Sequence, residues 1–301
     1  MPFLRSSLLK DHTTATETKK IDLPTNPLSH LIISLDGYNV TDEATLAEII
    51  AFINTVEVTH MGRTVLDLQS EDLAALNAYL YGAPCTLTNN VATDNATRIL
   101  SLVVPFGRRT FDADECFPAT KKGELTLTLD TTVPTASLDN STLNIEAVEL
   151  LGASPSRYLK TTLLSVAAPG ATGDNDIDLP IGNKIAALLI WNTTFPAASS
   201  HTFGVDMVKL LVDNVELGYA SARAHCLCSD VSFRVPDLHR DIAAYGQVLP
   251  ANYFWLDYDP HGDGNWLLDT AGKSSVKLRA TMGVDEASRV TVVELVSTTG
   301  A

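Results

Sequence analysis

The chain contains 301 residues, 45% of them hydrophobic and 19% charged, so it can bury ample core in two domains of ordinary size. Its formal charge of −15 argues against broad electrostatic attraction to nucleic acid or to an anionic membrane, and we expect no sequence-specific nucleic-acid partner. The opening stretch MPFLRSSLLKD is short and is broken by Arg5. We therefore expect no signal peptide and a soluble product made in the cytoplasm.

The first twenty residues differ in composition from the rest of the chain. We interpret residues 1–20 as a flexible, slightly basic arm rich in Ser and Thr. Its four cations outnumber its two acids: Arg5, Lys10, Lys19 and Lys20 against Asp11 and Glu17.

Period-two segments rich in β-branched residues predict most of the remaining elements as strands. In the first half these segments are 31–35, 55–59, 99–104, 125–129 and 143–150. After a break at Pro155 and Ser156 the same pattern returns at 158–166, 185–191, 205–212, 253–258, 276–281 and 290–296. Turn residues between the segments are typical of antiparallel connections.

Three stretches have helical spacing instead. Asp42–Phe52 places Leu46, Ile49 and Ile50 on one face, and Glu71–Leu80 has Ser70 as a candidate N-cap and Gly82 as a candidate end. The third predicted helix is Asp237–Tyr245, closed by Gly246. The last two helices occupy the same slot in each half, between corresponding strands.

Four short segments of the first half recur in the second half in the same order. The clearest is Ile21–Pro24, which returns as Ile177–Pro180, 156 residues later. The other pairs are 105–107 with 260–262, 125–127 with 276–278, and 148–150 with 293–295. The offset decreases gradually along the chain, which is what different loop lengths in two copies of one fold produce.

We therefore predict an all-β fold made of two tandem eight-stranded jelly-roll sandwiches with a few short helices. The predicted domains are a flexible arm over 1–20, a first jelly roll over 21–154 and a second over 155–301.

Several segments also resemble a known family. Pro155-Ser156 is followed by Asp178–Pro180 and the strand Ile185–Ile190; Val212–Val215 is followed by Leu238–Tyr245 with Gly246 and then by the aromatic strand from Tyr253. In the first half, Val56–Val58 through Gly62-Arg63 resembles the equivalent element. In order and spacing these segments are similar to the double-jelly-roll major capsid proteins of tailless icosahedral viruses, closest to the corticovirus type of bacterial virus with an internal membrane.

This resemblance implies a structural protein of the virion capsid, made in the host cytoplasm. It implies a pseudo-hexagonal homotrimer in which each subunit contributes two similar sandwiches. The implied partners are the chain itself, neighbouring trimers, and penton or minor capsid proteins. The base of the shell is implied to face an internal membrane or the genome.

The search for enzyme chemistry leads us to expect no catalytic residues. Ala271–Ser274 resembles the end of a phosphate-binding loop, but Leu267 stands where that loop needs a glycine, so a β-turn is the better interpretation. Glu146 and Glu149 lie three apart on a predicted strand and point to opposite faces, so they cannot act as a pair. Asp112, Asp114 and Glu115 are interpreted as solvated loop charges.

One acidic segment suggests a cation. Asp257, Asp259 and Asp263 alternate as in a calcium loop, but Leu268 replaces the bidentate glutamate of an EF-hand. A weaker calcium site formed by these three carboxylates between subunits stays open, against a solvated acidic turn. No other cofactor is expected.

The cysteines are expected to be small buried hydrophobes rather than zinc ligands. His225 lies near Cys226 and Cys228, but no second pair has the spacing of a zinc site, and Cys226 and Cys228 would alternate on a buried strand. Cys85 and Cys116 are not arranged as a pair either.

Two other functions remain open. A carbohydrate-binding or carbohydrate-active jelly roll is the main alternative, because Tyr253, Trp255, Tyr258 and Trp266 could form a sugar-binding surface. An adhesin is the other, and the expected absence of a signal peptide argues against it.

Overall fold

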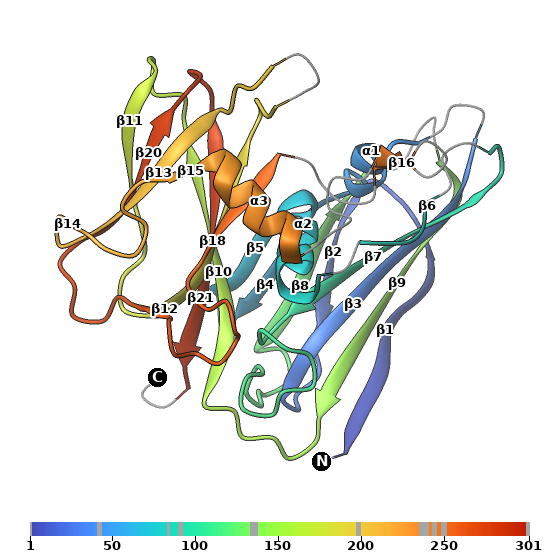
Figure 1. Cartoon of the computed structure of the whole chain (residues 1–301). Helices are drawn as coiled ribbons and strands as arrows, with labels where there is room; N and C mark the ends of the chain where they lie inside the picture. The colour runs from blue at the N-terminus through green and yellow to red at the C-terminus, as the bar shows by residue number, and fades with distance from the viewer. Residues whose placement is uncertain are drawn as a thin grey trace. The chain divides into compact units, whose positions relative to one another are not determined.

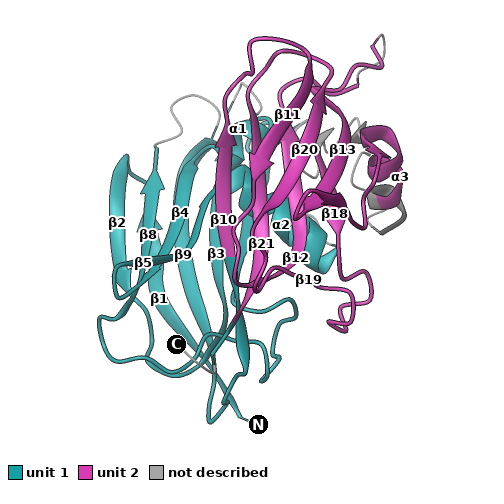
Figure 2. Cartoon of the chain, turned by 90° about the vertical axis from the view of Figure 1, so that its left-hand side faces the viewer, with its two compact units in different colours: residues 1–160, 237–250, 297–301 teal, residues 161–236, 251–296 magenta. Residues whose placement is uncertain are grey.

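A computed structural model describes residues 2–40, 44–82, 85–89, 93–132, 138–196, 200–234, 241–242, 246–247 and 252–298. The chain divides into two compact units (Figure 2). Unit 1 holds residues 1–160, 237–250 and 297–301, and unit 2 holds residues 161–236 and 251–296. The first passage from one unit to the other therefore follows Lys160, a few residues after the predicted start of the second domain at residue 155.

Unit 1 contains two antiparallel sheets (Figure 1). The first has the order β1-β9-β3-β7-β6, with strands β1 (Phe3–Thr13), β9 (Leu138–Leu150), β3 (Leu28–Asn39), β7 (Thr97–Pro105) and β6 (Thr86–Asn89). The second has the order β2-β8-β4-β5, with strands β2 (Glu17–Asp22), β8 (Leu125–Thr131), β4 (Ile53–His60) and β5 (Arg63–Gln69).

Unit 2 repeats this arrangement. Its first sheet has the order β10-β21-β12-β18, with strands β10 (Arg157–Val166), β21 (Ser288–Ser297), β12 (Lys184–Asn192) and β18 (Tyr253–Asp257), and with β19 (Leu268–Asp269) also on β12. Its second sheet has the order β11-β20-β13-β14, with strands β11 (Gly173–Asp178), β20 (Val276–Met282), β13 (Val205–Val212) and β14 (Val215–Glu216), and with β15 (Ala222–Arg223) also on β13.

The strand order is that of a jelly roll in both units. Each unit has eight principal strands when the short strands β6, β15, β16, β17 and β19 are left out. Numbered along the chain, the first, eighth, third and sixth of them form one sheet, and the second, seventh, fourth and fifth form the other. Two sheets joined in this way form a double Greek key. The prediction of two tandem eight-stranded jelly rolls is confirmed.

The repeat extends to the pairing register. Ile21 on β2 faces Leu127 on β8, and Ile177 on β11 faces Leu278 on β20. Beyond each strand the same hydrogen bond follows: Leu23 N–H donates to Leu125 O at 3.0 Å, and Leu179 N–H donates to Val276 O at 2.9 Å. The recurrence of Ile21–Pro24 as Ile177–Pro180 is thus a structural repeat.

One of the four repeated segments has the wrong register. Phe106 N–H donates to Ser29 O, and Tyr258 N–H donates to Ala186 O at the matching position of unit 2. Phe106 therefore corresponds to Tyr258 and not to His261, so the pairing of 105–107 with 260–262 is wrong by three residues. The two tripeptides look alike because each accompanies the end of a strand. In unit 1 the proline, Pro105, is the last residue of β7, whereas in unit 2 Pro260 lies three residues after the end of β18 at Asp257.

Two of the predicted helices form with shifted boundaries. Helix α1 (Leu46–Ile50) is shorter than Asp42–Phe52, because Thr45 caps it through a capping box with Glu48; its buried face is Leu46, Ile49 and Ile50, as predicted. Helix α2 (Ser70–Tyr81) ends at Gly82, which has φ 61°. Ser70 is not its N-cap: that position is Gln69, and the Ser70 hydroxyl donates to Ile50 O.

The third predicted helix is wrong in position. Most of Asp237–Tyr245 lies outside the described residues, and the described part, Asp241–Ile242, is strand β16, paired with β17 (Gly246–Gln247). The helix of this slot is α3 (Ala224–Arg234), which buries Ala224 and Leu227 three residues apart. Cys226 is consequently exposed and Cys228 half-buried on a helix, so the prediction that they alternate on a buried strand is wrong.

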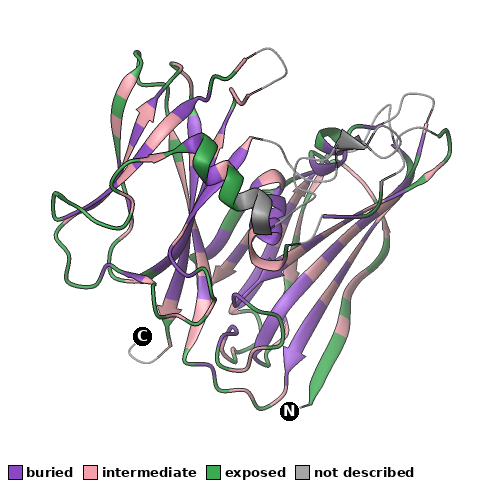
Figure 3. Ribbon diagram, in the orientation of Figure 1, coloured by how far each residue is buried: buried purple, intermediate pink, exposed green. Residues whose placement is uncertain are grey.

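The prediction of a flexible arm over 1–20 is also wrong. Strand β1 pairs with β9 from Phe3 to Thr13, and β2 pairs with β8 from Glu17 to Asp22. Both are edge strands whose side chains are mostly exposed or half-buried, which explains the polar composition (Figure 3). Bulges interrupt β1 after Ser7 and Leu9, a feature that edge strands use against unwanted pairing.

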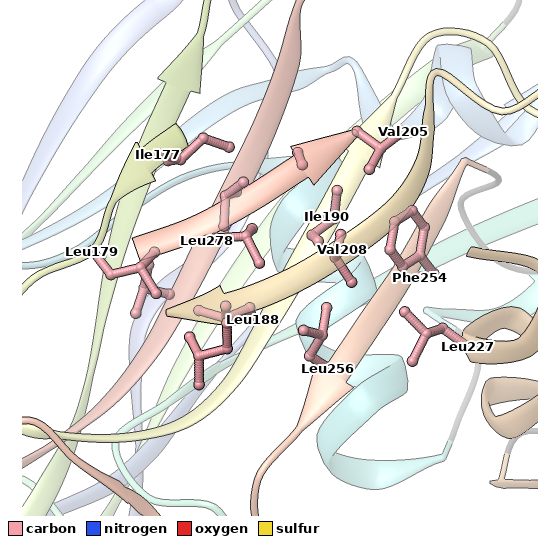
Figure 4. Close-up of a cluster of buried hydrophobic side chains, with 14 of the residues drawn as sticks. Ile177, Leu179, Leu188, Ile190, Val205, Val208, Leu227, Phe254, Leu256 and Leu278 are labelled. Atoms are coloured by element: carbon pink, nitrogen blue, oxygen red, sulfur yellow. The ribbon is translucent and has the colours of Figure 1, made fainter. Parts of the chain in front are cut away.

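Each unit has its own hydrophobic core, because alternate residues of both sheets point inward. In unit 2 the core includes Leu188 and Ile190 of β12, Leu278 of β20 and Phe254 of β18 (Figure 4). Leu31, Ile33 and Leu127 are equivalent buried residues of unit 1. Among the described residues, no helix is long and apolar enough to cross a membrane.

Candidate assembly elements

A buried glutamate fixes the first strand of unit 1 to the last. Glu149 on β9 is only 4% exposed. Its carboxylate accepts hydrogen bonds from the Ser6 hydroxyl on β1 at 3.1 Å and from the Asn26 amide at 2.7 Å. One side chain therefore ties together the edge strand, the last strand and the loop before β3.

Unit 2 contains the same arrangement. Glu294 on β21 is 1% exposed and accepts from the Thr162 hydroxyl on β10 at 2.6 Å and from the Asn183 amide at 2.8 Å. We call Glu149 and Glu294 the paired glutamates. The repeat of 148–150 as 293–295 was visible in the sequence, but nothing there indicated that its glutamate was buried and held by two donors.

An ion cluster holds the linker between the units. The carboxylate of Glu115, 3% exposed, accepts from Arg108 Nε at 2.9 Å and also forms an ion pair with Arg157, the first residue of β10. Burial raises the pKa of Glu115, but hydrogen bonds and charge from Arg108 together with the charge of Arg157 outweigh it, so the pKa lies below its usual value. The prediction that Glu115 is a solvated loop charge is wrong.

Main-chain hydrogen bonds complete this linker clamp, which we define as Arg108, Glu115 and Arg157 with the segment Pro155–Lys160. Ser156 N–H donates to Asp114 O at 3.1 Å, and Leu159 N–H donates to Phe106 O at 2.9 Å. From the other end of the chain, Thr298 N–H donates to Ser156 O at 2.9 Å. The linker is therefore held by the loop between β7 and β8 and by the residue that follows β21.

Of the three predicted calcium ligands, Asp257 ends β18 and the other two lie in the loop that follows; all three bind main-chain groups. Asp257 accepts from the Asp259 N–H at 2.8 Å, Asp259 from the Gly264 N–H at 2.9 Å, and Asp263 from the Asn265 N–H at 3.0 Å. In the described part of the chain, no three His, Cys, Asp or Glu side chains converge as a metal site. Calcium at these residues stays a prediction.

All four cysteines are free thiols. Cys85 and Cys116 are buried, as predicted, and burial raises the pKa of their thiols to about 12 and about 11. Burial also raises the pKa of Cys228 to about 12. The structure thus places none of these thiols where it would ionise at neutral pH.

The aromatic residues of the carbohydrate alternative do not form one surface. Tyr253, Trp255 and Tyr258 are 3–7% exposed and belong to the interior. Only Trp266, 68% exposed, faces solvent.

No protein-family model matches the sequence, and no curated protein matches it. Solved structures do match over nearly the whole chain. The major capsid protein P2 of bacteriophage PM2 is 16% identical, with a TM-score of 0.67 and 100% of each chain covered. A chain in the structure of Sulfolobus Turreted Icosahedral Virus is 12% identical, with a TM-score of 0.70, covering 98% of this chain and 91% of that one.

The chain is a double jelly roll. A quasi-atomic model of the PBCV-1 virus capsid shares the fold at 10% identity and a TM-score of 0.59, covering 98% of this chain and 94% of that one. At such identities the comparisons establish the fold of this double jelly roll, and its function has to be argued from its own residues.

Proposed function

We propose that this double jelly roll is a viral major capsid protein that forms pseudo-hexagonal homotrimers tiling an icosahedral shell. The observation that carries the proposal is the repeat of one sandwich within one chain, down to its register and its paired glutamates. Three copies of such a chain present six similar sandwiches, which suits packing in a hexagonal array through similar edges. The likeness of its fold to the major capsid protein of bacteriophage PM2 and to the PBCV-1 virus capsid supports the same function.

The proposal includes the location and the partners. The protein would be made in the host cytoplasm and would reside in the virion capsid of a bacterial virus, as a structural protein rather than an enzyme. Its partners would be neighbouring trimers, penton or minor capsid proteins, and an internal membrane beneath the shell. The carbohydrate alternative retains only Trp266, because the other three aromatic residues are buried.

The test is the assembly state of the full chain. Sedimentation equilibrium should give a particle of three times the 32.3 kDa chain mass, and electron microscopy should show sheets or closed shells with hexagonal tiles. A monodisperse monomer that binds a glycan column would contradict the proposal and favour the carbohydrate alternative.

A further inference from the structure

Exposed apolar side chains gather at one end of each unit. We call it the linker end: in unit 1 it is where β9 finishes at Leu150, and in unit 2 where β21 finishes at Ser297. Of the large hydrophobic residues that are exposed in the described chain, only Tyr38 and Leu87 lie at the opposite end of unit 1. Those near the linker ends are Phe3, Leu4, Met61 and Phe111 in unit 1, and Ile181, Val215, Leu217 and Trp266 in unit 2.

In unit 1 the linker end carries a cationic projection. The turn His60–Arg63 is a tight hairpin with φ 50° at Met61 and 78° at Gly62, and Met61 N–H donates to Glu124 O of the neighbouring turn Lys121–Glu124. We call these two turns the basic turn pair. Met61 is 70% exposed, and around it Arg63, Lys121 and Lys122 are exposed. None of these three cations forms an ion pair within the described part of the chain.

In unit 2 the linker end carries an acidic projection. The segment Asp257–Asp269 runs from the last residue of β18 through β19, and we call it the acidic Trp loop. It contains four Asp and one His but no Lys or Arg. Its own carboxylates hold its main chain, as described above, so the exposed Trp266 is displayed on an ordered loop. Asp263 and Asp269 are exposed on either side of it in the sequence.

We propose that the basic turn pair of one copy docks on the acidic Trp loop of a second copy. The two surfaces have opposite charge, which favours the correct pairing and disfavours like with like. Trp is one of the residue types enriched among the anchors of protein interfaces, and Met, Lys and Arg are favourable neighbours for it through sulfur–aromatic and cation–π contacts.

This contact joins different surfaces of the two copies. A head-to-tail interface of this kind closes into a ring when its rotation allows, and a three-membered ring is the proposed trimer. The inference rests on the proposed function and adds to it a residue-level interface, with a fixed order of units around the ring.

Sedimentation equilibrium of the full chain measures this interface directly. Trp266→Ala and the double variant Lys121→Glu/Lys122→Glu should each weaken self-association by about 30-fold, the loss expected for an interface anchor worth about 2 kcal/mol. Leu87→Ser, at the opposite end of unit 1, is the matched control, because Leu87 is 72% exposed and should leave the association constant unchanged. Equal melting temperatures would show that the variants remain folded.

Cross-linking tests whether the two surfaces meet between copies. Chains carrying Met61→Cys and chains carrying Trp266→Cys are mixed and oxidised, and a covalent dimer should form in the mixture well above the level of either variant alone. Two controls detect disulfides that form through the exposed Cys226. The first is each variant oxidised alone, and the second is a mixture in which Leu87→Cys replaces one of the two variants. A cross-link that forms only within one chain carrying both substitutions would overturn the proposal.

The remaining outcomes separate the interface from the function. If the chain forms trimers and sheets but the variants associate normally, the interface is wrong and the capsid function stands. If the chain stays monomeric at all concentrations, the proposed function itself fails. Flotation with phosphatidylglycerol vesicles that depends on Lys121, Lys122 and Trp266, without any effect on self-association, would assign these surfaces to a lipid partner instead and would overturn the docking of two copies.

Discussion

The two units keep the same β framework but use one of their loops in opposite ways. The loop between β7 and β8 of unit 1 buries Glu115 against Arg108 and Arg157. The corresponding loop of unit 2 is held open by its own Asp residues and exposes Trp266. The sheets stay alike because their alternating residues share a core, whereas a loop is free to change its role. The loop of unit 1 therefore holds the linker segment, whereas the corresponding loop of unit 2 presents an exposed tryptophan.

The largest effect is expected from breaking the loop that buries Glu115. Glu115→Ala leaves the buried Arg108 without its counter-charge, so the free energy of unfolding should fall by about 3–5 kcal/mol. Urea denaturation measures it, with Glu124→Ala as a partly exposed control from the same loop. A loss as small as the control's would mean that the linker clamp does not stabilise the first unit.

The same cluster predicts a dependence on pH. The pKa of Glu115 lies below its ordinary value of 4.5 in the folded chain, so its stabilisation is complete above 4.5 and is lost as the pH falls through the lowered pKa. Urea denaturation of the native chain and of Glu115→Gln should therefore differ most near neutral pH and converge in acid. A difference that stays constant down to pH 3 would contradict the assignment.

A smaller effect, equal in the two units, is expected at the paired glutamates. Glu149→Ala and Glu294→Ala each leave a hydroxyl and an amide donor without their acceptor, which should cost about 1–3 kcal/mol. Glu146→Ala, on the other face of β9, removes only a half-exposed pair with Arg5 and should cost less than about 1 kcal/mol. Clearly unequal losses at Glu149 and Glu294 would break the equivalence of the units.

The smallest effect concerns the acidic Trp loop. If Asp257, Asp259 and Asp263 bind calcium between subunits, a chelator should lower the melting temperature of the assembled protein by a few degrees, corresponding to roughly 1 kcal/mol. Asp263→Asn should remove that response, while Asp112→Asn in the corresponding loop of unit 1 should keep it. An unchanged melting curve would eliminate calcium.

The sequence predicts the central strands but, of the edge strands, only β10 and β18 among the long ones, for a physical reason. All eleven period-two segments coincide with strands, with 253–258 running one residue past β18, because a strand buried on one face must alternate. The strands that were missed include β1, β2, β5 and β11, which lie at sheet edges. Such strands are held largely by main-chain hydrogen bonds to a single neighbour, and their side chains leave little pattern.

The residues of the candidate assembly elements could also be predicted only in part. The sequence repeat places Glu149 and Glu294 in matching tripeptides, but it does not indicate that they are buried or hydrogen-bonded. Burial of Glu115 could not be foreseen, because its partner Arg157 is 42 residues away and an acidic loop residue is exposed by default. Helix α3 was missed because its Cys and Ser residues conceal the spacing of Ala224 and Leu227.

The linker clamp also determines how the protein should respond to proteases. A segment between two folded units is usually where a protease cuts, because its main chain is free to enter the active site of the enzyme. In Pro155–Lys160 the amides of Ser156 and Leu159 are engaged, and Arg157 is held by Glu115. Native trypsin digestion should therefore spare the segment Pro155–Lys160.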